Sequence, residues 1–144
     1  MPASRGIGAT PLHPVHSILL AFPLALFPAG LASDIAYLNS AAVQWTNFSA
    51  WLIAGGCFFG GLTLAWAIVA LAFPGRTTRG RALVYLAAVA VMFIAGLINA
   101  FQHSHDGWSS VGAAGLVLSI ISSVAALIAA AIGYSSQRAE GLIR

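Results

Sequence analysis

Four long apolar stretches, separated by short polar ones, dominate the sequence. They cover about 16–38, 48–73, 81–101 and 111–134. A helix needs about 20 predominantly apolar residues to cross the roughly 30 Å of hydrocarbon in a bilayer, so each stretch is long enough to span it. None shows the sustained alternation with a period of two that marks a membrane β-strand. The pattern predicts an all-α fold, an integral membrane four-helix bundle.

The segments between the stretches contain breakers and polar residues that lipid could not satisfy. They cover 39–47, 74–80 and 102–110, and none is long enough to hold a soluble domain. We therefore expect one compact unit: an interfacial segment at 1–15, a four-span domain at 16–134 and a cytoplasmic tail at 135–144.

Composition excludes a soluble domain of this size. Of 144 residues 60% are apolar and 6% charged, and the mean hydropathy is +0.92. A small soluble fold cannot bury so much apolar surface. The net charge of +3 rests on arginines beside apolar stretches, which favours a role in membrane orientation over nucleic-acid binding.

Basic residues near the spans gather on the cytoplasmic side of membrane proteins. The first and third connections contain neither Lys nor Arg, and the six basic residues are Arg5, Arg76, Arg79, Arg81, Arg138 and Arg144. All six share one side if both termini are cytoplasmic. This topology places His16 and His103 at opposite membrane surfaces. The separation is about 27 Å, because 18 helical residues rise by about 1.5 Å each.

A cleavable signal peptide is the alternative for the N-terminus. An apolar core at 18–27 is followed by small residues before Ser33, and cleavage there would leave three spans. The apolar run continues to Leu38, past that position, which favours an uncleaved first span.

Small residues recur every three or four positions in three spans and predict helix packing, because small side chains let membrane helices approach closely. They are Gly56, Gly60, Gly96, Gly115 and Ser119. We expect these seams to pack the helices of one chain, with a homodimer face as the alternative.

Ionisable side chains near the third connection are the candidate metal ligands. His103, His105 and Asp106 follow one another closely, and Asp34 reaches the same side of the membrane. Imidazole and carboxylate are ligands for zinc, copper or nickel. The alternative for the histidines is a solvated loop. For Asp34 there are two alternatives: an acid at the helix end that reaches water or bonds nearby backbone or hydroxyls, and a proton or cation site.

His13 and His16, just before the first span, are the candidate cofactor ligands. A b-type haem needs two imidazoles at matching depth on different helices. The topology separates His13 and His16 from the other pair, His103 and His105. The alternative is an interfacial turn. We find no paired carboxylates, phosphate-binding loop or nucleophile with a base at its depth, so we expect no enzyme.

Short motifs occur along the chain: Pro11-Leu12-His13-Pro14, Phe22-Pro23, Ser33-Asp34, Trp51-Leu52-Ile53-Ala54-Gly55-Gly56, Asn99 and Gly115-Leu116-Val117-Leu118-Ser119. Over about 9–141 the chain resembles, through these motifs, a bacterial four-span membrane family catalogued as domain of unknown function 2231. The resemblance implies a four-helix inner-membrane fold without an established activity.

Together these observations predict a multi-pass protein of the bacterial inner membrane that acts as a non-catalytic accessory or scaffold subunit of a larger complex. We expect the lipid bilayer and other membrane subunits as its partners, no nucleic acid, and no cofactor. The alternative is a haem- or metal-binding redox module that uses the histidine pairs.

Overall fold

The computed structural model describes residues 13–72, 79–104 and 111–141, and it contains four long helices in this part of the chain. They are α1 (Pro14–Ser40), α2 (Val43–Ala72), α3 (Arg79–Ser104) and α4 (Ala113–Gly141). All four are long and apolar enough to cross a membrane. The predicted all-α, four-span architecture is confirmed.

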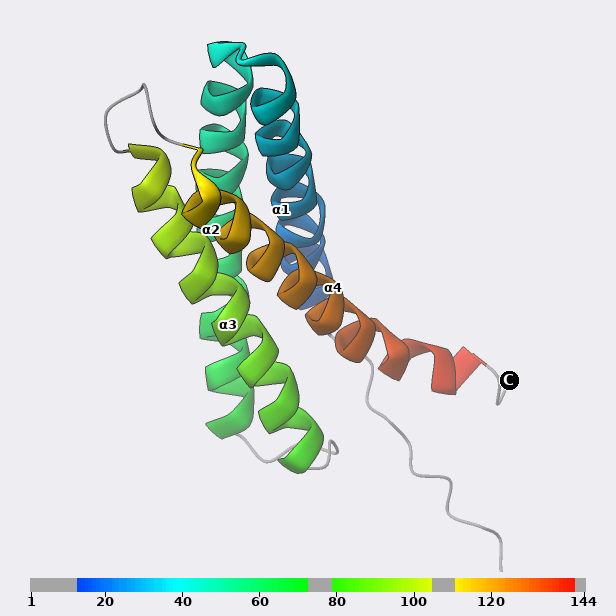
Figure 1. Ribbon diagram of the computed structural model, residues 1–144. Coiled ribbons are helices and arrows are strands. Elements are labelled where there is room, and N and C mark those ends of the chain that lie inside the picture. Colours follow the sequence, from blue (N-terminus) through cyan, green and yellow to red (C-terminus); the bar gives the residue numbers. More distant parts are fainter. Residues whose placement is uncertain (1–12, 73–78, 105–110, 142–144) are drawn as a thin grey trace, which may run out of the picture.

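Neighbouring helices run antiparallel and form a ring (Figure 1): α1 packs on α2, α2 on α3, α3 on α4, and α4 on α1. One end of the bundle therefore holds the start of α1 and α3 and the last turns of α2 and α4. We call it the basic end, because Arg79 and Arg81 begin α3 there. The other end, which contains the α1–α2 turn, is called the Asp34 end.

The turn between α1 and α2 is much shorter than the expected segment at 39–47. Only Ala41 and Ala42 separate the two helices. Ala41 adopts a left-handed conformation, with φ 54°, and its N–H donates to the carbonyl of Tyr37 at 2.7 Å. Gln44 and Asn47 are exposed, and they continue as helix because a membrane helix that extends beyond the hydrocarbon can expose polar side chains to headgroups and water.

Every helix turns one seam of regularly spaced residues inward. The buried positions recur alternately every three and four residues, as in left-handed helix bundles. On α1 they include His16, Leu20, Pro23, Phe27, Gly30 and Asp34; on α2 Thr46, Ser49, Ile53, Gly56, Gly60, Thr63 and Ala67; on α3 Tyr85, Val89, Met92, Gly96, Asn99 and His103; on α4 Gly115, Ser119, Ser122, Ala126, Ala129 and Gly133. Large apolar side chains outside the seams face outward, as a lipid solvent allows.

Phe27 fills the middle of the bundle. Its ring lies against two glycines: a methyl group added at Gly56 would stand 3.0 Å from the ring, and one added at Gly96 only 2.5 Å from it. A methyl group added at Gly60 would stand 3.9 Å from the same ring. These glycines therefore make room for an aromatic side chain of α1 between α2 and α3.

Candidate functional site

Asp34 lies in the core of the bundle, near the end that contains the α1–α2 turn. It occupies the inward seam of α1, one turn beyond Gly30, and its exposed fraction is 0%. We expected an acid that reaches water or headgroups or bonds nearby hydroxyls; the access to water is wrong, whereas the bonds to hydroxyls are present. The reason is the register of α1, which directs this position toward the other three helices.

Each of the other helices contributes a side chain to this carboxylate. Ser49 of α2 donates to Oδ1 at 2.5 Å, and Ser119 of α4 donates to Oδ2 at 2.5 Å. His103 of α3 places Nε2 2.9 Å from Oδ1. Both oxygens are therefore used inside the protein, and the contacts join all four helices. We call Asp34, Ser49, Asn99, His103 and Ser119 the Asp34 network.

His103 has an oxygen acceptor at each ring nitrogen. Nδ1 lies 3.0 Å from the backbone carbonyl of Asn99, while Nε2 faces the Asp34 carboxyl. A carbonyl can only accept, so Nδ1 carries a proton. A second proton must then lie between Nε2 and Oδ1, either on the imidazole beside a carboxylate or on the carboxyl beside a neutral imidazole. In both cases the pair as a whole is neutral, which suits its burial.

Asn99 connects the two sides of the network. Its side-chain amide donates to Ser119 Oγ at 2.7 Å, and this hydroxyl donates onward to Asp34. The backbone carbonyl of Asn99 meanwhile orients His103. Asn99 Oδ1 is buried without a hydrogen-bond partner. Chemically, the network can hold one proton and shift it along the bond between Nε2 and Oδ1 without changing its net charge.

Of the four candidate metal ligands, the structure brings Asp34 and His103 together. His105 and Asp106 lie outside the described residues. Among the residues that are described, no group of three or more His, Cys, Asp or Glu side chains could hold a metal ion. His103 itself lies on the last turn of α3 and is buried, whereas a solvated loop was one of our expectations for it.

His13 and His16 lie at the basic end, far from the Asp34 network. Both rings approach Trp66 of α2, with centroid separations of 5.3 and 5.8 Å. His16 is 2% exposed, and its Nε2 lies 2.6 Å from the hydroxyl of Tyr85, near the start of α3. Tyr85 and His103 are 18 residues apart on one helix, about 27 Å. His16 and His103 thus lie at opposite ends of the bundle, as predicted.

The five packing candidates all lie on inward seams. Gly56, Gly60 and Gly96 surround the ring of Phe27, and Gly115 is buried on α4. Ser119, proposed only as a packing residue, also carries the second hydrogen bond to the Asp34 carboxyl.

Ser49 and Tyr85 are the members of these sites that the sequence did not single out. A signal for Ser49 was present: it continues the three- and four-residue spacing from Thr46 to Gly56, so its hydroxyl falls on the small-residue seam of α2. Tyr85 carries no comparable signal, because a tyrosine near a span end is also typical of the membrane interface.

A family model described as "Predicted membrane protein (DUF2231)" matches residues 12–141. The chain belongs to the DUF2231 family. This match covers all four helices of the described residues and the sequence positions of all four histidines, and it confirms the resemblance seen in the sequence. Comparison with curated proteins and with solved structures gave no match.

Proposed function

We propose that this DUF2231 protein is a non-catalytic accessory or scaffold subunit of a larger complex in the bacterial inner membrane, with both termini in the cytoplasm. The observation that carries the proposal is that the Asp34 carboxyl group contacts side chains of the three other helices. Its two oxygens accept hydrogen bonds from Ser49 and Ser119 and face His103, on three different helices.

A buried polar cluster of this kind favours one arrangement of helices over others. In lipid, apolar side chains contact tails and neighbouring helices with similar ease, so a few polar contacts decide which faces meet. Moving any one helix along its axis by a residue, about 1.5 Å, would break its contact with the carboxyl. A scaffold requires such a fixed shape.

The outward faces supply surface for lipid and for partner subunits. Several large side chains are more than half exposed, among them Trp51 at 75%, Phe58 at 64% and Phe101 at 62%. Because they lie on α2 and α3, these two helices offer bulky aromatic side chains to whatever surrounds the bundle.

The alternative function is a haem- or metal-binding redox module. The contact between Asp34 and His103 at 2.9 Å, and the position of His13 and His16 near each other, both against Trp66, are the observations that favour it. Such a module would need further ligands at either end, since His16 Nε2 already faces Tyr85.

Purification from native membranes under mild detergent tests both functions on one sample. The scaffold proposal predicts a second membrane protein in stoichiometric amount, identified by mass spectrometry, with no haem absorbance and no stoichiometric metal by elemental analysis. Asp34→Asn should reduce recovery of that partner, whereas Ser104→Ala, an exposed change beside His103, should not. Recovery of the chain alone would contradict the proposal, and stoichiometric haem or metal would favour the alternative.

A further inference from the structure

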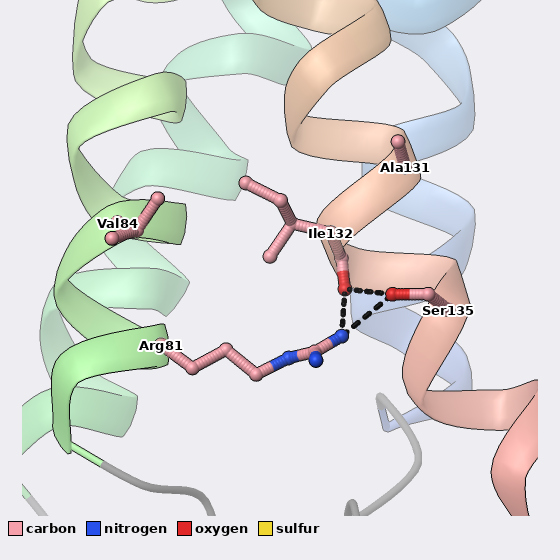
Figure 2. Close-up of a pocket in the computed structure, with 5 residues that line it drawn as sticks. All are labelled: Arg81, Val84, Ala131, Ile132 and Ser135. Atoms are coloured by element: carbon pink, nitrogen blue, oxygen red, sulfur yellow. Dashed lines mark hydrogen bonds between the residues drawn. The ribbon is translucent and has the colours of Figure 1, made fainter.

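A cleft of about 360 Å³ opens between α3 and α4 at the basic end of the bundle (Figure 2). It is lined by Arg81, Val84, Ala131, Ile132 and Ser135. It forms because α4 crosses the bundle at an angle, so that its later turns move away from the start of α3 (Figure 1). Val84 is 59% exposed, and the cleft is therefore open to the surroundings of the bundle.

Arg81 reaches across the mouth of this cleft. Its Nη2 donates to the carbonyl of Ile132 at 2.8 Å and to Ser135 Oγ at 2.6 Å. A guanidinium group carries five N–H donors on three nitrogens. These two bonds use only Nη2, so they hold the group in place while the N–H groups of Nη1 and Nε remain for another acceptor. Such a planar donor set matches the oxygens of a phosphate.

The charge at the cleft mouth is positive. None of the five lining residues is acidic, and among the residues whose side chains the structure describes, no carboxylate forms an ion pair with the guanidinium. Arg81 also lies in the first turn of α3, where the helix dipole adds partial positive charge. An anionic group is therefore the complementary ligand.

The cleft changes from polar to apolar along the direction of its two helices. Arg81 and Ser135 share one level, and the chain directions place Val84 and Ile132 one turn further into the bundle, about 4.5 Å away. Ala131 continues this apolar wall. A free anion would leave that part unfilled, whereas a lipid would place its phosphate at Arg81 and an acyl chain along the wall.

We propose that this cleft is a binding site for an anionic glycerophospholipid, with Arg81 as the ligand of its phosphate. Basic pockets between membrane helices are a recognised setting for anionic headgroups. The site is independent of the Asp34 network and of the proposed scaffold role, since it requires only that the helices lie in a bilayer.

Native mass spectrometry of the full chain, exchanged between phosphatidylglycerol and phosphatidylcholine, tests the proposal. Wild type should retain phosphatidylglycerol preferentially. Arg81→Gln should lower its retention about fivefold, the effect of one basic residue at a membrane surface. Arg79→Gln is the matched control: it removes the same charge two residues away, from an exposed side chain that does not line the cleft, and should change retention less than twofold.

A second variant tests the apolar wall without altering the charge. Ala131→Phe places a ring in the cleft and should also reduce phosphatidylglycerol retention about fivefold. Equal losses for Arg81→Gln and Arg79→Gln would overturn the proposal in favour of diffuse surface charge. Displacement of the lipid by millimolar inorganic phosphate, or full retention in Ala131→Phe, would overturn it in favour of a site for a free anion.

Discussion

Gly96→Ala probes how tightly Phe27 is wedged between two helices. The new methyl group would stand 2.5 Å from Cζ and 2.6 Å from Cε1 of the ring, whereas carbon atoms prefer about 3.5–4.0 Å. The ring would have to move by about 1 Å. It has little room to do so, since Cε1 and Cζ also approach Gly56 so closely that a methyl group there would lie 3.0 and 3.1 Å from them.

The expected net effect is a loss of about 1–2 kcal/mol of unfolding free energy. Overpacking a core costs about 1–3 kcal/mol, and a contact of 2.5 Å belongs to the upper half of that range, about 2–3 kcal/mol. The higher helix propensity of Ala returns about 1 kcal/mol of this cost. Unfolding by SDS in mixed micelles, followed by tryptophan fluorescence, measures the difference. Gly80→Ala, on the same helix with nothing within 4 Å of the added methyl group, should not be destabilising by more than about 0.5 kcal/mol.

The cause can be isolated by removing the ring. Phe27→Ala should itself cost about 3–5 kcal/mol, but in that background Gly96→Ala has space and should be neutral or stabilising. If Gly96→Ala is harmless in wild type, or equally harmful with and without the ring, the packing argument is refuted.

Three further changes test other parts of the structure by the same unfolding assay. Ala41→Gly should stabilise the protein by about 1 kcal/mol, because glycine adopts the left-handed conformation without the strain of a Cβ atom; no gain would contradict that turn geometry. Ser119→Ala should lower the free energy of unfolding by about 1.5–3 kcal/mol, since the Ser119 hydroxyl bonds a buried carboxyl. The control Ser123→Ala, one turn away, removes a buried hydroxyl without a partner and should be neutral or stabilising. Equal effects of the two changes would refute the hydrogen bond between Ser119 and Asp34. Tyr85→Phe should cost about 1–3 kcal/mol, because both ring nitrogens of His16 would then be buried without partners; an unchanged stability would show that the imidazole finds water.

The four spans follow from hydropathy because length and apolarity are sufficient to identify a membrane helix. The short α1–α2 turn could not be found in this way, since residues such as Gln44 and Asn47 are polar whether they lie in a loop or on a helix beyond the hydrocarbon. Only the backbone bond from Ala41 to Tyr37 shows where α1 ends.

The candidate site was visible in part. Asp34 and His103 were predicted to reach the same side of the membrane, and the structure places them in contact. Their burial was missed because hydropathy does not distinguish the lipid face of a helix from its core face when both are apolar. The alternation of three and four residues that joins Asp34 to Gly30 and Phe27 holds that information.

The glycines were identified for a different reason from the one the structure gives. Gly56 and Gly96 were expected to let helix backbones approach each other. They instead accommodate the ring of Phe27, a partner that lies about 30 and 70 positions away in the sequence. Spacing within one helix cannot name a partner on another.

The most direct test of the account is the coupling free energy between Asp34 and His103. A double-mutant cycle of Asp34→Asn, His103→Gln and the combined variant, measured by unfolding in mixed micelles, isolates this term. Ordinary hydrogen bonds between membrane helices contribute about 0.6 kcal/mol and at most about 1.7 kcal/mol. Removal of one member of a buried ion pair costs about 3–5 kcal/mol. The account predicts a coupling of about 2 kcal/mol or more, with the combined variant little worse than either single one. Costs that add to within about 0.5 kcal/mol would contradict it.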